Sequence, residues 1–188
     1  MMSLVLSAAG LSAALATTVK PLTLSEMVKR SPRIVHGTVV ETHSQWEEGG
    51  TQIYTYVTLT PKEMLKGKAP AAGETLTFRQ MGGRVGDRVI YVAGTPRFSV
   101  KQEVLVFLTG DDRGGYSQVM GIFQGAFRPT AGAGRGVEGV SPEAIGSLVP
   151  GNETVSSDAG VSPAAGTFDQ FLQRIRGLVR DQAEGRAP

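Results

Sequence analysis

The chain contains two histidines, His36 and His43, which are its candidates for acid–base or metal chemistry. Seven positions apart on one extended strand, their side chains point to opposite faces unless a bulge intervenes, which argues against a shared metal ion. Glu41 and His43 have the same parity along such a strand, so they can pair weakly on one face. The interpretation that we favour is a surface histidine at the end of a strand.

Other residues that could do chemistry are few. The sequence has no cysteine, which excludes disulfides, a thiolate metal site and a cysteine nucleophile. No Gly-x-Ser-x-Gly motif marks a serine nucleophile, and Gly82-Gly83-Arg84 lacks the Lys-Ser/Thr of a phosphate-binding loop. Asp87 and Glu103 are isolated, and Asp111-Asp112 falls in a tight turn. We therefore predict no catalytic residues, no metal, no cofactor and no enzyme activity.

The composition fits one domain with tails. A chain of 188 residues, of which 40% are hydrophobic, can form a single core. Its 25 glycines and 10 prolines favour turns over long helices. The net charge is only +2 and the basic residues are scattered, whereas a nucleic-acid-binding protein typically gathers them in a stripe. A nucleic-acid partner is therefore not expected.

Five apolar segments, rich in β-branched residues, alternate with glycine-rich turns. They are Arg33–Glu41, Ile53–Met64, Glu74–Gln80, Glu103–Thr109 and Tyr116–Arg128. Strand-sized segments at this spacing predict a small antiparallel sandwich or barrel. The Val104–Leu108 run reads as a fully buried strand. We therefore predict a mainly β fold.

Three local patterns refine this picture. Gly37 interrupts the first segment and predicts a bulge or a close backbone contact. Odd-numbered residues of the 53–59 segment share one face of a strand, and even-numbered ones, among them Tyr54 and Tyr56, share the other. Residues Met81–Val100 form a glycine-rich excursion that is long for a loop inside a compact domain, which favours either a functional role or mobility.

Two helices are predicted outside the strands. Thr23 and Glu26 form the pattern of a capping box, and Ser31-Pro32 ends the short helix that follows. Near the other end, Thr167 caps an amphipathic helix that extends to residue 183. Its apolar stripe is Phe168, Phe171, Leu172, Ile175, Leu178 and Val179. The stripe must dock on the chain's own domain or on a partner, and we favour the first.

The first sixteen residues look like an export signal. They carry no charge and end in Ala14-Leu15-Ala16, a small-x-small pattern that suits cleavage before Thr17. This segment is too short to span a bilayer, and the alternative is a buried N-terminal helix. The predicted organisation is a signal peptide at 1–16, a β-barrel domain at 17–130, a flexible linker at 131–166 and a C-terminal helix at 167–183. We expect an exported protein, periplasmic or extracellular, without a transmembrane segment in its mature form.

Several segments together are similar to netrin-like domains, which include the tissue inhibitors of metalloproteinases and are OB-type five-stranded barrels. The segments are Arg33-Ile-Val-His-Gly-Thr-Val, Tyr56-Val-Thr-Leu, Glu63-Met-Leu-Lys-Gly67 and Glu103-Val-Leu-Val-Phe-Leu. The chain also resembles a set of uncharacterised exported bacterial proteins that share Gly-Thr-Val, Leu-Lys-Gly and Phe-Gln-Gly-Ala-Phe landmarks. The resemblance covers about residues 30–128 and implies a small OB-like, netrin-like antiparallel β-barrel. The inhibitors chelate zinc through an N-terminal cysteine, which this chain lacks, so their mechanism does not carry over.

The favoured function is a non-catalytic exported binding or assembly module that acts through protein–protein contacts. Its partner would be another exported or envelope protein. The predicted contact surface combines aromatic residues with arginines of the Met81–Arg97 loop: Trp46, Tyr54, Tyr56, Arg84, Arg88 and Arg97. The competing interpretation is that the aromatic residues only pack within the fold.

Two other functions stay open. One is an inhibitor or chaperone-like partner of a secreted hydrolase, in which the Met81–Gly94 loop enters a cleft. The other is a single-stranded nucleic-acid-binding OB-type protein, assisted by Arg79, Arg84, Arg88 and Arg97. Export argues against this last function.

Overall fold

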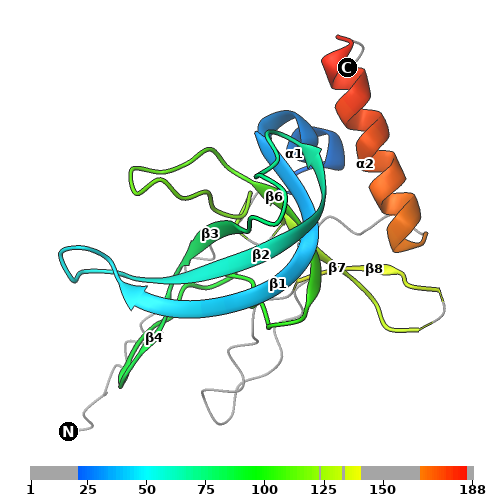
Figure 1. Ribbon diagram of the computed structural model, residues 1–188. Coiled ribbons are helices and arrows are strands. Elements are labelled where there is room, and N and C mark those ends of the chain that lie inside the picture. Colours follow the sequence, from blue (N-terminus) through cyan, green and yellow to red (C-terminus); the bar gives the residue numbers. More distant parts are fainter. Residues whose placement is uncertain (1–20, 123, 133, 141–165, 186–188) are drawn as a thin grey trace, which may run out of the picture.

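The computed structural model describes residues 21–122, 124–132, 134–140 and 166–185, and Figure 1 shows how their helices and strands are arranged. The elements in chain order are α1 (Leu24–Arg30), β1 (Arg33–Trp46), β2 (Ile53–Lys66), β3 (Leu76–Met81), β4 (Gly83–Val85), β5 (Arg88–Ile90), β6 (Glu103–Leu108), β7 (Ala126–Pro129), β8 (Val137–Gly139) and α2 (Phe168–Ala183). The predicted signal peptide at 1–16 lies outside the described residues.

Six of the eight described strands form one antiparallel sheet in the order β3-β2-β1-β6-β7-β8, and β4 and β5 form a separate hairpin. β1 and β2 are each 14 residues long and make a curved ribbon across the molecule (Figure 1). The prediction of a mainly β, antiparallel fold with a short helix before the strands and a longer helix after them is confirmed.

Over the described residues the sheet is open, with β3 and β8 at its edges, and its ladder does not close into a barrel. The sheet nevertheless curls, because the Arg79 N–H on β3 donates a 3.0 Å hydrogen bond to the Ser117 carbonyl in the segment after β6. That segment does not continue as a regular strand. Gly121 adopts a φ of +63°, so the chain turns there and β7 begins only at Ala126. The prediction of one strand over Tyr116–Arg128 is therefore wrong for the described residues before Ala126.

Bulges curve the β1–β2 ribbon. The pairing of the two strands shifts register at three places, one of them between His36 and Gly37. Each bulge adds a residue to one strand, which bends it and increases its twist. A Cβ at Gly37 would lie 2.6 Å from the Thr60 carbonyl oxygen, so only glycine fits. The predicted bulge and close backbone contact at Gly37 are confirmed.

The sheet extends beyond the predicted domain boundary at residue 130. β8 pairs with β7 through Arg128 and Glu138, whose side chains also form a 2.6 Å ion pair. Residues 137–139, which the sequence analysis placed in a flexible linker, therefore form an edge strand. The 141–165 part of that predicted linker lies outside the described residues.

β6 separates two hydrophobic clusters, because all its residues from Val104 to Leu108 are buried and alternate between its faces. Leu105 and Phe107 belong to the cluster that the helices cover. Val104, Val106 and Leu108 belong to the second cluster, together with Phe78 of β3. The fully buried strand predicted here is confirmed.

Both predicted helices form, and both begin with a complete capping box. The residues are Thr23 with Glu26 in α1 and Thr167 with Gln170 in α2. The apolar stripe of α2 packs into the first cluster of its own chain: Phe168, Phe171, Leu172 and Ile175 are buried, and Leu178 and Val179 pack beside them. Neither described helix has the length and apolarity that crossing a membrane requires.

Candidate functional site

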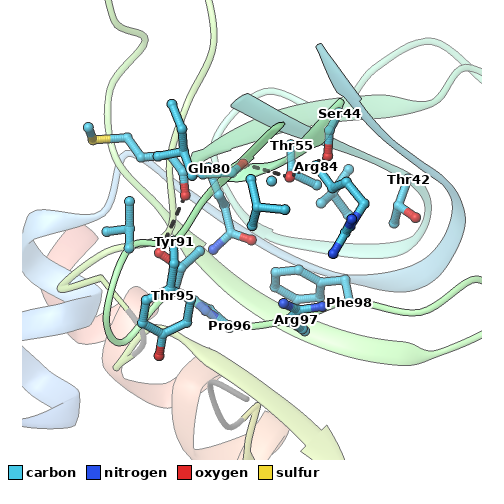
Figure 2. A pocket seen from close by; sticks show the side chains of 17 residues that line it. Thr42, Ser44, Thr55, Gln80, Arg84, Tyr91, Thr95, Pro96, Arg97 and Phe98 are labelled. Atoms are coloured by element: carbon cyan, nitrogen blue, oxygen red, sulfur yellow. Dashed lines mark hydrogen bonds between the residues drawn. The ribbon is translucent and has the colours of Figure 1, made fainter. Parts of the chain in front are cut away.

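A pocket of about 390 Å³ lies where the β1–β2 ribbon, the end of β3, the β4–β5 hairpin and the 91–98 loop meet (Figure 2). This volume falls within the range of sites that bind small molecules or single side chains of a partner. The pocket continues the inner side of the curled sheet, because Val57 and Phe98 line it and also pack in the second hydrophobic cluster. The predicted excursion from Met81 to Val100 therefore forms one wall of a cavity.

Two adjacent glycines fold the excursion over the sheet. Gly82 and Gly83 have φ values of +94° and +141°, which residues with side chains rarely adopt. A Cβ at Gly83 would collide with the hydroxyls of Ser44 and Thr55. The Gly82 N–H donates a 2.8 Å hydrogen bond to the Ile53 carbonyl. These constraints hold the β4–β5 hairpin directly against the ribbon.

A chain of hydroxyls forms part of the pocket floor. The Thr55 hydroxyl donates to the Gly82 carbonyl at 2.8 Å and lies 2.9 Å from the Ser44 hydroxyl (Figure 2). Because Thr55 has one hydroxyl proton and gives it to Gly82, Ser44 must be the donor in their shared hydrogen bond. Ser44 therefore presents only lone pairs to the pocket and can accept an N–H or O–H from a ligand.

Gln80 is the most unusual residue of the site. It is only 5% exposed and lines the pocket, and Figure 2 shows its side chain reaching into the space between the sheet and the 91–98 loop. No residue of the described part of the chain forms a hydrogen bond with its carboxamide. Its amide atoms are not among the buried, unpaired side-chain atoms of the described residues, so they are open to the pocket and free to bond a ligand.

The position of Gln80 in the sequence carries a signal of a binding role. Leu76, Phe78 and Gln80 share one face of β3, and the first two pack in the second hydrophobic cluster. A glutamine on an otherwise apolar strand face is a candidate binding residue. The hydroxyls of Ser44 and Thr55 gave no such signal, since serine and threonine are common on exposed strand faces.

The lining is positively charged. Arg84 from β4 and Arg97 from the loop both line the pocket, and none of the lining residues is an aspartate or a glutamate. A guanidinium group beside a partly apolar cavity favours a ligand with an anionic oxygen group.

The structure separates the residues that the sequence analysis grouped as a contact surface. Arg84 and Arg97 line the pocket, whereas Arg88 lies on the same hairpin outside the lining. Trp46 stands at the end of β1, paired with Ile53, and is 38% exposed. Tyr54 and Tyr56 are buried and contact Arg79, on the other side of β2 from Thr55.

Arg79 of β3 is the central residue on the face of the sheet that carries Tyr54 and Tyr56. Its guanidinium lies over the Tyr54 ring, 3.9 Å from the centroid, and its Nε donates a 2.8 Å hydrogen bond to Asp112. Burial alone lowers the pKa of Arg79, but the hydrogen bonds to Asp112 and Tyr56 outweigh it and raise the pKa. Arg79 is buried and paired, so it is not available to a nucleic acid.

Glu103, predicted to be isolated, contacts His36 and two cationic side chains, those of Lys62 and Arg135. His36 Nε2 lies 2.8 Å away, Lys62 Nζ 3.0 Å and an Arg135 guanidinium nitrogen 2.6 Å. Burial raises the pKa of Glu103, but these hydrogen bonds outweigh it and lower the pKa to about 2. The prediction failed because the partners come from β1, β2 and the β7–β8 connection, far apart in sequence.

The two histidines have separate roles. His36 is 9% exposed and contacts the Phe168 ring edge-on, so the prediction of a surface histidine is wrong for this residue. His43 is exposed, stacks on Tyr56 and lies 3.3 Å from Glu41, which confirms the predicted weak pair. Across the described residues, no group of three histidine or acidic side chains is arranged to hold a metal ion.

No protein-family model matches the chain, and no curated protein sequence matches it significantly. The similarity to netrin-like domains therefore stays a prediction.

Proposed function

We propose that the chain is a non-catalytic binding module that acts through protein–protein contacts and that its contact surface is the pocket between the ribbon and the Met81–Phe98 segment. The observation that carries the proposal is the 390 Å³ cavity, with a Gln80 carboxamide in its wall that bonds to no residue of the described part of the chain. The groups that line it are hydroxyls, an amide, guanidiniums and apolar side chains, which suit recognition better than acid–base chemistry.

The rim of the pocket supports a protein partner. Met81, Val89 and Tyr91 line the pocket and are 40%, 46% and 41% exposed. Aromatic residues, methionine and arginine are enriched in the cores of protein interfaces, so this rim has the composition of a contact surface.

We also propose that the fold is OB-type and that the protein works outside the inner membrane. The curl of the sheet and the Arg79–Ser117 hydrogen bond support a barrel-like architecture. OB-type domains bind ligands on one sheet face and the adjoining loops, which is where this pocket lies. Residues 1–16 are the basis for export.

The alternative is an inhibitor or chaperone-like partner of a secreted hydrolase. The β4–β5 hairpin projects from the sheet at the end opposite the helices (Figure 1), which supports insertion into a cleft. Inhibition would then depend on the exposed hairpin turn at Gly86 and Asp87.

The test is affinity capture from native envelope and culture fluid, with quantitative mass spectrometry. Immobilised wild-type protein should enrich a partner that Arg84→Gln protein loses, while Arg113→Gln protein, altered at an exposed arginine outside the lining, should retain it. Equal recovery on all three proteins would overturn the pocket as the contact surface. For export, sequencing of the mature N-terminus should begin at Thr17, and a cytosolic protein that keeps residues 1–16 would contradict it.

A further inference from the structure

We infer that the pocket binds the C-terminal residue of a partner polypeptide, with its free carboxylate against Arg84 and its amide N–H against Ser44. This inference rests on the proposed function, because it specifies which part of a protein partner the pocket takes. Three features of the pocket carry it: the unpaired carboxamide, the split between donors and acceptors, and the apolar wall.

The first feature is Gln80. The residue as a whole is 5% exposed and lines the pocket, and its carboxamide has no hydrogen-bond partner in the described part of the chain. A carboxamide offers two N–H donors and one acceptor oxygen, which matches a ligand that itself carries both an acceptor and a donor. A bound polypeptide terminus would supply the partners that the folded chain does not.

The second feature is the separation of donors and acceptors. Ser44 can only accept, because its proton is committed to Thr55 and the Thr55 proton to Gly82. Arg84 can only donate, and it carries a positive charge. A simple anion would satisfy Arg84 and meet lone-pair repulsion at Ser44. The last residue of a polypeptide has an amide N–H next to a carboxylate and can satisfy both.

The third feature is the apolar part of the lining. Val57, Pro96 and Phe98 lie beside the polar groups, and Val57 and Phe98 are continuous with the second hydrophobic cluster. An aliphatic or aromatic side chain on the terminal residue would bury its surface there, which stabilises the complex by about 25 cal/mol for each Å² withdrawn from water. The preferred ligand therefore ends in an apolar residue.

The test compares three probes on the full chain by titration calorimetry and by amide chemical shifts. They are N-acetyl-alanyl-alanyl-leucine with a free carboxylate, the same peptide as its C-terminal amide, and 4-methylpentanoate, which has the carboxylate and the apolar group but no N–H. We expect the peptide acid to bind at least about tenfold more tightly than either other probe. Equal binding of the acid and the amide, or no binding of the acid up to about 10 mM, would overturn the inference.

Variants then assign the interaction to the pocket. Gln80→Leu keeps the size of the side chain and removes its polar group, so the peptide acid should bind at least about tenfold more weakly. The melting temperature should stay close to that of the wild type, because the carboxamide bonds to no residue of the described part of the chain. Arg84→Gln should weaken the peptide acid and leave the amide unchanged, and Arg113→Gln should change neither. A fall in melting temperature with Gln80→Leu would show that the carboxamide serves the fold and would overturn the inference.

The failure of this inference and the failure of the proposed function give different results. A captured partner that depends on Arg84, combined with no binding of the peptide acid, rejects the C-terminal ligand and keeps the contact surface. Tight binding of 4-methylpentanoate equal to that of the peptide acid points to a small organic acid and rejects the polypeptide terminus.

Discussion

The guanidinium of Arg79 lies 3.9 Å from the Tyr54 ring centroid and 5.6 Å from that of Tyr116, so the two tyrosines flank a buried cation. The side chain of Arg79 is 8% exposed and is held by Asp112, which also accepts hydrogen bonds from the backbone of Gly114 and Tyr116. This arrangement connects β2, β3 and the turn after β6. It also accounts for the burial of Tyr54 and Tyr56, which pack against this cation.

Replacing Arg79 should destabilise the fold. Arg79→Met keeps much of the aliphatic stem but leaves Asp112 without its cation, and we expect a loss of roughly 2–4 kcal/mol in the free energy of unfolding. Urea denaturation followed by tyrosine fluorescence measures this. Arg113→Met, at an exposed arginine in the adjoining turn, should change stability by less than about 0.5 kcal/mol. Equal effects of the two variants would contradict a structural role for Arg79.

Gly37 should not tolerate a side chain. A Cβ there would lie 2.6 Å from the Thr60 carbonyl oxygen and 3.2 Å from the Pro61 Cα, both backbone atoms that cannot move aside without breaking the bulge. Gly37→Ala should lower the free energy of unfolding by roughly 2–4 kcal/mol. Gly110→Ala is the matched control, since a Cβ at Gly110 meets no atom within 4 Å. A Gly37→Ala protein as stable as the control would show that the ribbon pairs differently.

The Glu103 cluster should make stability depend on acid pH. The pKa of Glu103 is held at about 2 in the folded state, against an ordinary value of 4.5. A carboxyl with a depressed pKa stabilises the fold above its unfolded pKa, and this contribution is lost as the pH falls from about 4.5 towards 2. Glu103→Gln should cost on the order of 2 kcal/mol at pH 7 and flatten the decline of stability in this interval.

Denaturation curves at intervals between neutral and acid pH measure this contribution. Glu48→Gln, at an exposed carboxyl in the β1–β2 turn, serves as the control and should leave the wild-type decline intact. If Glu103→Gln reproduces the wild-type decline, other carboxyls such as Asp111 and Asp112 account for it. The hydrogen bond from Ser117 lowers the pKa of Asp111. Burial raises the pKa of Asp112, but hydrogen bonds, with that from Arg79 first among them, outweigh burial and lower it.

The C-terminal helix should be part of the folded domain. Ile175 is fully buried in the first hydrophobic cluster, and Ile175→Ala should cost about 2–4 kcal/mol. Gln173→Ala, at an exposed position of the same helix, should cost less than about 0.5 kcal/mol. A chain that ends at residue 165 should lose cooperative unfolding. Unchanged stability of that truncated chain would instead make α2 available to a partner.

Local patterns predicted the helices and most of the strands correctly, because helix caps and the alternation of apolar and polar residues depend only on residues that are close in sequence. Thr23 and Thr167 cap α1 and α2, and Val104–Leu108 is buried on both faces of β6. The strand predicted over Tyr116–Arg128 failed because Gly121 turns the chain, and a left-handed glycine looks the same in sequence as one in a strand.

The site could be predicted only in part. The Met81–Val100 excursion, Arg84 and Arg97 do surround a cavity. Ser44 and Gln80 were missed because they meet only when the ribbon and β3 curl together. The Glu103 cluster was missed for the same reason, since Lys62 and Arg135 lie 41 positions before and 32 positions after it.

α2 and the β4–β5 hairpin lie at opposite ends of the molecule (Figure 1), and residues of that hairpin line the pocket. A tether attached to the solvent side of α2, for example at the exposed residue Arg174, would leave the cavity mouth facing the bulk medium. Sensors and affinity resins built on this chain should therefore be coupled through that helix.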